Sequence, residues 1–351
     1  MDININILNI DKHFFVDKDK KFDVNYSNKI VDKSYFSINE ANICHKIKKI
    51  SCYYNFFSIL EDIEALNISQ LNDNIIEKLK DVDNIQYYLF KYNNKNSVDF
   101  INFIYNFTSI KKLILYSINS LQHLLNGLNI LNDNNICFFD ISPKNIIFLE
   151  NYREKPVLNN FKLSINTNKL NYTNISYILK KMTDFTYQPL EIHILYYFVE
   201  ENMETISYAF IEELCEEFIE KLNILRLFSE TYRNKYKEQC IETMRKYINL
   251  SKKEILDDIL ERNDKWDVYG ISLLFLQIFG CIYRVFSLND TFISKIIIEL
   301  ISNIHPDSDK RLSLEDTINI LDKYLNEEND WEFVNNLDNK KITELFDEFS
   351  K

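Results

Sequence analysis

Apolar and polar residues alternate with a period of two in the first 35 residues of the chain. This period is typical of strands with one buried face, and the charged stretch 17–20 indicates a turn between two such runs. The apolar positions are Ile3, Ile5, Ile7, Phe22, Val24 and Tyr26. The segment 86–92 is also strand-like and ends in a polar stretch. The N-terminal part is therefore predicted to contain short antiparallel strands.

From residue 37 the apolar spacing lengthens to three and four residues, which is typical of helices. Ser37 and Glu40 are spaced as a capping box, so a helix is expected to begin there. One face of this helix is apolar, at Ile43, Ile47 and Ile50. Helical spacing then dominates at 100–107 and 110–131. The pattern predicts an α+β fold with a small β-containing part before a larger helical part.

Helical spacing continues in the second half of the chain. An amphipathic helix with an acidic polar face is predicted at 206–228, followed by helices at 232–248 and 251–260. Ser251 and Glu254 form a capping-box pattern at the start of the last of these. After residue 328 an amphipathic tail is outlined by Trp331, Phe333, Ile342, Leu345, Phe346 and Phe349.

The composition predicts a folded chain with a sizeable core. Of 351 residues, 46% are hydrophobic and 27% are charged, so wholesale disorder is not expected. The chain has 3 Gly and 4 Pro against 26 Phe and 22 Tyr, and its heavy use of Asn, Lys and Ile indicates codon bias in an AT-rich genome. The formal net charge of −12 argues against a nucleic-acid backbone as the main partner.

Cysteine usage and hydropathy indicate an intracellular protein. The six cysteines are scattered, without a C-x-x-C pair or a histidine at metal-ligand spacing, so buried free thiols are expected. The N-terminus has no basic region typical of a signal peptide, and Gln277 and Arg284 interrupt the apolar run 271–286. We therefore expect a soluble protein of the cytoplasm, neither secreted nor bound to a membrane.

The segment 138–148 carries the clearest candidate chemistry. Asp140 is followed five residues later by Asn145, with Pro143 and Lys144 between them and an apolar run after them. This spacing resembles the catalytic loop of protein kinases. There the aspartate orients the attacking hydroxyl and the asparagine binds a metal ion.

Further segments stand in the order that this resemblance requires. Residues 157–164 resemble a strand followed by the D-F-G motif, with Asn160, Phe161 and Lys162 at the three motif positions. The other landmarks are the helix with its ion-pairing glutamate at Glu40, the end of the activation segment at 187–191, the start of the central helix at 267–274 and the motif before the last helix at 306–315.

The resemblance covers about residues 25–328, and the loop is similar to that of divergent kinase-like proteins of large DNA viruses. If that virus-like resemblance holds, the compartment implied is the cytoplasm of the host. It implies a two-lobed fold with a reduced N-lobe at 1–92, a C-lobe at 93–328 and an amphipathic tail at 329–351. The long interval before the central helix implies a helical insertion at about 198–262. This insertion either packs on the larger lobe or docks a protein partner.

Two contacts are implied by the same resemblance. Glu191 is expected to form a buried pair with Arg311, tying the activation segment to the last helices. Asp267 is expected to accept hydrogen bonds from the backbone around Phe138 and Phe139, which would orient the loop. The alternative for each charged residue is an ordinary solvated side chain.

Several positions depart from the kinase pattern. The aspartate of D-F-G is Asn160, which brings no charge to a metal ion, and the glycine is Lys162, whose ammonium either disfavours metal or holds phosphate directly. No glycine occurs before Gly127, so a glycine-rich loop over the phosphates is absent from the sequence. The best match for the nucleotide-binding lysine is Lys29, with Lys33 as a rival and a surface lysine as the remaining alternative.

The catalytic loop itself is altered as well. Phe138 and Phe139 replace the usual His-Arg pair, so an apolar contact with Phe161 is retained while the arginine that grips a phosphorylated activation loop is lost. Lys144 is close enough to substitute for the lysine that usually contacts the transferred phosphate. Asp140 is either the catalytic base or a hydrogen-bonded loop residue in an inactive protein.

The resemblance implies a divergent Ser/Thr-type protein kinase that transfers phosphate weakly from ATP to protein hydroxyls. Asn145 and Asn160 would lie around Mg²⁺, and Lys29 and Glu40 would lie at the nucleotide. The alternative is a catalytically inactive pseudokinase that serves as a binding or scaffold module. A small-molecule phosphotransferase is a third interpretation. The activation-segment glutamate Glu191 and the motif that contains Arg311 argue against it.

Overall fold

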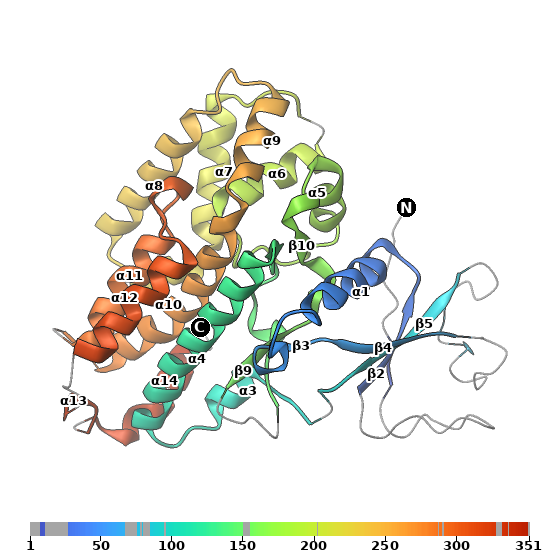
Figure 1. Cartoon of the computed structure of the whole chain (residues 1–351). Helices are drawn as coiled ribbons and strands as arrows, with labels where there is room; N and C mark the ends of the chain where they lie inside the picture. Colours follow the sequence, from blue (N-terminus) through green and yellow to red (C-terminus); the bar gives the residue numbers. More distant parts are fainter. Residues whose placement is uncertain are drawn as a thin grey trace. The chain divides into compact units, whose positions relative to one another are not determined.

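The computed structural model describes residues 8–10, 27–66, 76–77, 79, 85–94, 96–149, 155–201, 203–286, 288–289, 291–327, 332–335 and 337–349. It has an α+β architecture in which helices predominate and the strands form small sheets (Figure 1). Several sequence-based predictions lie outside these described residues, namely those at Ile3, Ile5, Ile7, Phe22, Val24, Tyr26 and Trp331.

The chain divides into two compact units. The first comprises Met1–Asp99 with Asn145–Ser164, and the second comprises Phe100–Lys144 with Ile165–Lys351. The sequence-based division placed 145–164 in the larger helical part. This stretch groups with the first unit because its two strands complete a sheet there.

An antiparallel sheet forms one layer of the first unit. Its strand order is β1 (Leu8–Ile10), β2 (Ser27–Asp32), β5 (Tyr87–Tyr92) and β4 (Leu60–Ala65). The strand predicted at 86–92 is thus confirmed as β5. Ile30 is fully buried and pairs with Leu89, whereas the neighbouring Lys29 pairs with Phe90. Because side chains alternate along a strand, Lys29 points to the face opposite Ile30.

Helix α1 (Tyr35–Ile47) follows β2 and begins earlier than the sequence predicted. Ser34, not Ser37, is the N-cap, and the two serines cap each other: Ser37 N donates to Ser34 Oγ at 3.4 Å and Ser34 N donates to Ser37 Oγ at 2.9 Å. The capping box predicted at Ser37 and Glu40 is therefore wrong. Glu40 lies inside the helix, where its side chain is buried.

A second sheet of the first unit joins distant parts of the chain. Its order is β3 (Phe57–Ser58), β9 (Pro156–Asn159), β8 (Ile146–Phe148) and β6 (Val98–Asp99). Short 3-10 turns flank these strands: η1 (Tyr53–Asn55), η3 (Pro143–Asn145) and η5 (Phe161–Leu163). The parallel pairing of β3 with β9 brings the segment after Asn159 close to α1.

Two long helices, α4 (Ile110–Asp133) and α10 (Trp266–Phe286), form the core of the second unit. The predicted helices at 100–107 and 110–131 correspond to α3 (Phe100–Tyr105) and α4. The remaining elements outside the insertion and the tail are β7 (Ile136–Cys137), β10 (Ile165–Asn166), η6 (Thr167–Lys169), α5 (Tyr172–Leu179), α6 (Leu190–Glu200), α11 (Phe292–Asn303), η9 (Ser308–Lys310) and α12 (Leu314–Glu327).

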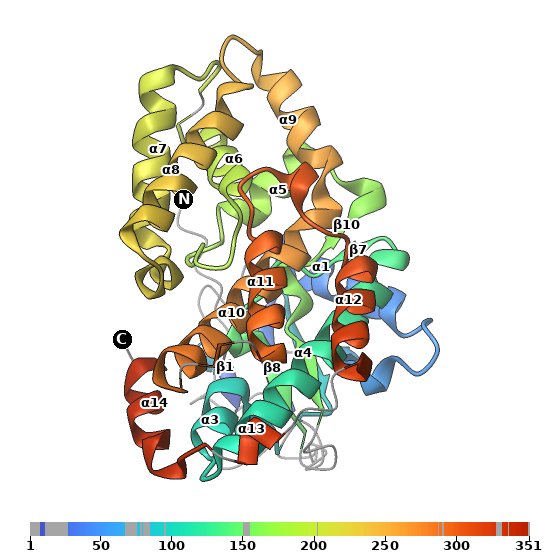
Figure 2. The same cartoon turned by 90° about the vertical axis from the view of Figure 1, so that its left-hand side faces the viewer.

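The predicted insertion is helical, and α7 packs on α8 within it (Figure 2). Its elements are α7 (Tyr208–Lys221), η7 (Asn223–Leu227), α8 (Glu230–Arg245), α9 (Lys252–Glu261) and η8 (Asn263–Lys265). The single helix predicted at 206–228 is wrong in its second half. Leu222 leaves the helical region with ψ of 80°, and the chain continues as the 3-10 turn η7.

The C-terminal tail packs on the second unit. It contains α13 (Glu332–Asn335), η10 (Asn339–Lys341) and α14 (Ile342–Phe349). The ring of Phe346 lies 5.1 Å from that of Tyr105 on α3, and Glu348 pairs with Arg284 on α10 at 3.0 Å. The apolar face predicted for the tail therefore covers α3 and α10 (Figure 2).

Helix α10 and the thiols bear on the expected environment of the protein. Within the described residues, one segment, Asn263–Phe286, is long and apolar enough to cross a membrane, and 78% of its most apolar window is buried inside the protein. Such burial is what the core helix of a soluble protein shows. All six cysteines are free, and all but the exposed Cys52 are buried.

Candidate functional site

The loop that carries Asp140 contains a strained turn in the second unit. Phe139 has φ of 67°, in the left-handed region that bulky side chains rarely adopt. The amide of Asp140 donates to the carbonyl of Phe138 at 2.8 Å, closing a γ-turn around Phe139. Strain of this kind costs about 1–3 kcal/mol and persists only where surrounding contacts hold it.

Asp267 and Gln188 supply these contacts. The Asp267 carboxylate accepts hydrogen bonds from the amides of Phe138 and Phe139, both at 2.7 Å. The side chain of Gln188 donates to the carbonyl of Phe139 at 2.7 Å, and the Trp266 ring packs edge-on against Phe139. The contact predicted between Asp267 and the loop is confirmed. The loop is therefore held from two sides.

The start of α10 packs closely against this loop. Burial raises the pKa of Asp267 to about 6, although the hydrogen bonds from the loop amides lower it. One turn later, a Cβ at Gly270 would lie 3.0 Å from Cβ of Ile141 and 3.1 Å from the carbonyl oxygen of Tyr187. Glycine is needed here because α10 approaches both segments closely.

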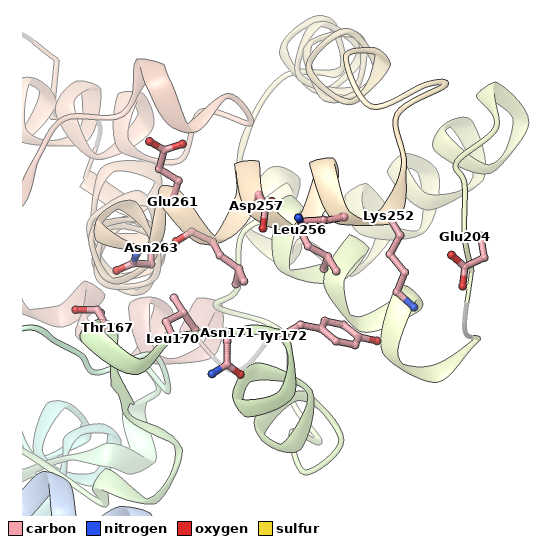
Figure 3. A pocket seen from close by; sticks show the side chains of 12 residues that line it. Thr167, Leu170, Asn171, Tyr172, Glu204, Lys252, Leu256, Asp257, Glu261 and Asn263 are labelled. Atoms are coloured by element: carbon pink, nitrogen blue, oxygen red, sulfur yellow. Dashed lines mark hydrogen bonds between the residues drawn. The ribbon is translucent and has the colours of Figure 1, made fainter.

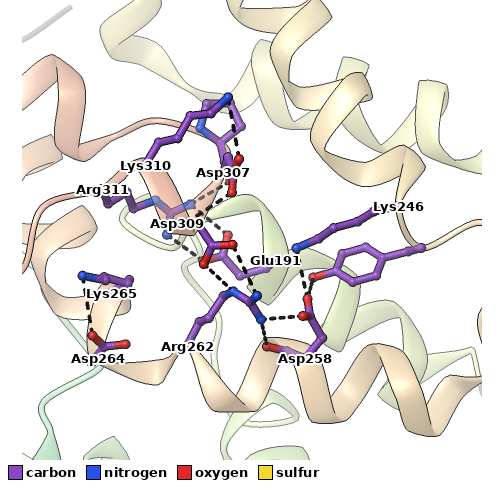
Figure 4. A network of polar contacts seen from close by, with 12 residues as sticks. Glu191, Lys246, Asp258, Arg262, Asp264, Lys265, Asp307, Asp309, Lys310 and Arg311 are labelled. Atoms are coloured by element: carbon purple, nitrogen blue, oxygen red, sulfur yellow. Dashed lines mark hydrogen bonds and ion pairs between the residues drawn. The ribbon is translucent and has the colours of Figure 1, made fainter.

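The pair predicted between Glu191 and Arg311 is present and buried (Figure 4). Nη1 and Nη2 of Arg311 donate to the two carboxylate oxygens at 2.6 and 3.0 Å. Its remaining donors reach the carbonyls of His305 at 2.7 Å and Pro306 at 3.0 Å. The guanidinium also lies 4.9 Å from the ring centre of Tyr269. The buried charges are thus matched by opposite charge and by hydrogen bonds.

A second ionic cluster fastens the insertion beside this pair (Figure 4). Arg262, just after α9, binds Asp258 and also Asp309 in η9, the latter at 2.7 Å. Asp258 further accepts from Lys246 at 3.1 Å and from the hydroxyl of Tyr247 at 2.7 Å. These bonds lower the pKa of Asp309, and they lower that of Asp258 against its burial. The end of the insertion is therefore anchored rather than free.

In the first unit, Lys29, Tyr92 and Glu40 form a compact group. The hydroxyl of Tyr92 donates to Oε1 of Glu40 at 3.0 Å, and the ammonium of Lys29 lies 4.6 Å from the centre of the Tyr92 ring. The resemblance implies a direct lysine–glutamate ion pair. Among the described residues no ion pair within 4 Å joins Lys29 to Glu40, and the hydroxyl of Tyr92 is the group that donates to this carboxylate.

Burial acts on both charges of this group. It raises the pKa of Glu40, against the attraction of Lys29 and the hydrogen bond from Tyr92. It lowers the pKa of Lys29, against the attraction of Glu40 and together with the repulsion of Lys162. Lys33, the rival for the nucleotide-binding position, lies beyond the strand and donates to Gln86 at 3.0 Å on the surface. Of the two lysines, only Lys29 is part of the buried group.

Asn145, Asn160 and Lys162 also belong to the first unit, and the charge of Lys162 acts on both Lys29 and Glu40. Asn160 has φ of 65° and donates its side-chain amide to Oδ1 of Asn145 at 2.7 Å. Asn39 of α1 donates to the carbonyl oxygens of Lys162 at 3.1 Å and Ser164 at 2.8 Å. Because Asn39 directly precedes Glu40, these bonds fix η5 and Lys162 beside the buried carboxylate.

The residues expected around Mg²⁺ do not fit that ion. Magnesium is normally held by one or two carboxylates together with phosphate oxygens and water. Here both side chains are neutral amides, and the oxygen of Asn145 already accepts the hydrogen bond from Asn160. Within the described part of the chain, no cluster of three or more His, Cys, Asp or Glu side chains is placed to hold a metal.

The other predicted site residues are placed as follows. Phe161 packs its ring 6.0 Å from that of Phe57 in the first unit, while Phe138 belongs to the held loop of the second unit. Lys144 is exposed in η3. Sequence reasoning missed Gln188, Tyr92, Asn39 and Trp266. Gln188 lies within the landmark 187–191 and Tyr92 within the predicted strand 86–92, but the sequence signals no partner for any of the four. Each acts through a contact between residues far apart in the chain.

Two cavities of the second unit are candidate binding surfaces. One, of about 470 Å³, is lined by Pro143 of the loop, by Tyr187 and by apolar residues of α3, α10 and η7. The other, of about 760 Å³, is open and lies between 167–172 and α9 (Figure 3). In it, Lys252 lies 5.1 Å from the centre of the Tyr172 ring, and acidic and basic side chains are mixed. The first cavity has the size of a ligand pocket, and its lining combines apolar side chains with Arg226, Arg284 and Glu348.

No protein-family model matches the chain, and a search of curated proteins finds no match to it.

Proposed function

We propose that this protein is a divergent Ser/Thr-type protein-kinase-like phosphotransferase of the cytoplasm that moves the terminal phosphoryl group of ATP slowly to a protein hydroxyl. The observation that supports it most is the turn at Phe139, kept in a strained conformation by Asp267 and Gln188. Outliers of this kind cluster at active sites, and this one immediately precedes Asp140.

Asp140 is the candidate catalytic residue. Its carboxylate would accept the proton of the substrate hydroxyl while that oxygen forms a bond to the terminal phosphorus. The bond between this phosphorus and the bridging oxygen then breaks, and ADP leaves with the electron pair. Lys144, exposed in the same loop, is suited to contact the transferred group.

Phosphoryl transfer is expected to be slow because Asn160 supplies no negative charge at the position where kinases have a carboxylate. Replacing a carboxylate by Asn160 removes one unit charge, which at ~4 Å and an effective dielectric of about 20 is worth about 4 kcal/mol. Losing that in the transition state lowers the rate roughly a thousandfold.

The cavity of about 470 Å³ supports a protein as the second substrate. Pro143 of the loop lines it, and Tyr187 fixes one wall by donating to Gln277 at 3.1 Å. An extended segment could place more than one apolar side chain in a cavity of this size. The neighbouring turn η7 belongs to the insertion, which would then contribute to the choice of partner.

The alternative function is that of an inactive binding module. The hydrogen bond between Asn160 and Asn145 favours it, because the two positions that usually hold metal satisfy each other. The anchored insertion at 198–262 would then be the surface that docks a protein partner.

An isosteric substitution tests the transferase proposal. Wild type, Asp140→Asn and the exposed control Asp133→Asn are incubated with labelled ATP, Mg²⁺ or Mn²⁺, and a mixture of protein substrates. We expect slow incorporation by wild type and the control, and a loss of about 100-fold or more in Asp140→Asn, since general base catalysis contributes about 10²–10⁴-fold. Equal incorporation by wild type and Asp140→Asn would remove Asp140 from catalysis. No incorporation by wild type would leave the binding module as the function.

A further inference from the structure

We propose that the first unit binds a triphosphate chain directly through the ammonium groups of Lys29 and Lys162, without a divalent metal ion. The inference deepens the proposed nucleotide-dependent function and rests on it. It concerns binding alone, so it can be tested separately from phosphoryl transfer.

The metal position is closed by the protein itself. The amide of Asn160 donates to Oδ1 of Asn145 at 2.7 Å, so the oxygen that would face a metal ion is already engaged. Neither side chain carries charge, whereas Mg²⁺ gives up its water reluctantly and relies on carboxylates. Binding of a metal ion here would break the hydrogen bond between Asn160 and Asn145, and neither side chain would supply a negative charge to the ion.

Lys162 is held in place by its backbone. Asn39 donates to the carbonyl oxygens of Lys162 and Ser164 at 3.1 and 2.8 Å, which fastens the middle and the C-terminal end of the turn η5 to α1. Asn39 is followed directly by Glu40, whose carboxylate accepts from Tyr92 at 3.0 Å. The base of the Lys162 side chain is therefore fixed beside the group that contains Lys29.

The charges of this group are not balanced. Lys29 and Lys162 bring two positive charges, while Glu40 brings one negative charge and shares it with the hydroxyl of Tyr92. In the part of the chain that the structure describes, the ammonium of Lys162 forms no ion pair within 4 Å. The surplus is local, because the whole chain has a net charge of −12. A surplus positive charge beside an amide pair suits an anion with several negative oxygens.

The ligand class follows from this charge pattern. Lysine acts as a point charge on phosphate and needs no fixed geometry. A metal-free triphosphate carries more negative charge than its magnesium complex, so it is the better match for two ammonium groups. Lys162 also repels a divalent cation at the neighbouring Asn160, which again favours the metal-free form.

Binding measurements test the inference. ATP and inorganic triphosphate are titrated by calorimetry into the full chain, in EDTA and in Mg²⁺. We expect ATP to bind in EDTA at least as tightly as in Mg²⁺, and inorganic triphosphate to compete with it. Lys162→Ala is expected to weaken binding in EDTA about tenfold, the effect of one lost charge contact. The matched control Lys33→Ala, which removes a surface ammonium from the same unit, leaves the affinity unchanged.

A second variant restores the missing carboxylate. Asn160→Asp is expected to weaken binding in EDTA several-fold and to make binding depend on Mg²⁺, and a melting curve checks that it folds. Binding by wild type in Mg²⁺ only, or equal affinity of wild type and Lys162→Ala in EDTA, overturns the inference.

The two proposals fail in different ways. Transfer that depends on Asp140 together with Mg²⁺-dependent binding keeps the proposed function and removes the metal-free site. Metal-free binding without transfer keeps the site and removes the transferase.

Discussion

Two ionic groups among the described residues, each built on a buried glutamate, differ in how completely their charges are matched. In the second unit, Arg311 donates to both oxygens of Glu191 and to the carbonyls of His305 and Pro306. In the first unit, Glu40 accepts from the hydroxyl of Tyr92, and the lysines beside it stay beyond ion-pair distance among the described residues.

The difference separates a structural charge from a candidate binding charge. The guanidinium of Arg311 is matched by the carboxylate of Glu191 and by two backbone carbonyls, so the value of this pair lies in holding the start of α6 to the segment before α12. A group with surplus charge is a poor stabiliser, because burial disfavours both ammonium and carboxylate. Such an arrangement is explained more simply by a ligand than by stability.

Replacing the glutamate of each group by glutamine is expected to affect stability very differently, and the larger effect is expected at Glu191. Glu191→Gln leaves the buried guanidinium of Arg311 without a counter-charge and is expected to cost about 3–5 kcal/mol of stability. Urea unfolding followed by circular dichroism measures the loss. The control Glu242→Gln removes an exposed partner of Arg245, 73% exposed, and is expected to change stability by less than about 0.5 kcal/mol. A loss no larger than that of the control would contradict the structural role of the pair.

His193 is a buried titratable group that, among the described residues, has no counter-charge in contact with it. His193 on α6 packs against the rings of Phe185 and Phe218, and within the described residues its Nε2 has no hydrogen-bond partner. Burial first, and then the charge of Lys221, lowers its pKa to about 4, against the opposing effects of backbone hydrogen bonds at Gln188 and Phe185 and of the charge of Glu217.

This pKa predicts a loss of stability in acid. Between about pH 6.5 and 4 the unfolded chain binds a proton at His193 that the folded chain does not, so stability falls as the pH falls, by about 3 kcal/mol in total. His193→Leu is expected to remove this part of the pH dependence, measured as urea midpoints from pH 7 to 4. His45→Leu, at an exposed position of α1, should retain the wild-type profile. Parallel profiles for wild type and His193→Leu would contradict the prediction.

Glu40→Gln gives the smallest expected effect. The amide oxygen of glutamine still accepts from Tyr92, and the buried negative charge is removed, so stability at pH 7 should change by about 1 kcal/mol or less. Because burial raises the pKa of Glu40 above its usual value, ionisation lowers the stability of the folded state as the pH rises above about 4.5. The variant should therefore gain on wild type from pH 4 to 7 in the same assay. A loss of stability as large as that of Glu191→Gln would show that Glu40 stabilises the fold as strongly as Glu191 does, which would contradict the difference between the two groups.

Local signals in the sequence predicted local structure well where nothing competed with them. Ser251 and Glu254 form the predicted capping box of α9, since both partners lie within one turn. The similar pattern at Ser37 and Glu40 failed because β2 ends at Asp32 and Ser34 then caps the helix first. The long amphipathic pattern at 206–228 did not reveal the break at Leu222.

The sequence alone determined the α+β class, the order of the helices, and the candidate residues Asp140, Asn145, Asn160 and Lys162, because residue type and spacing are properties of the chain. Tertiary structure decided which of these side chains are engaged and by what. Tyr92 reaches Glu40 across 52 residues, and Gln188 reaches Phe139 across 49. Such contacts arise from strand register and helix packing, which place distant residues together without leaving a periodic signal in the sequence.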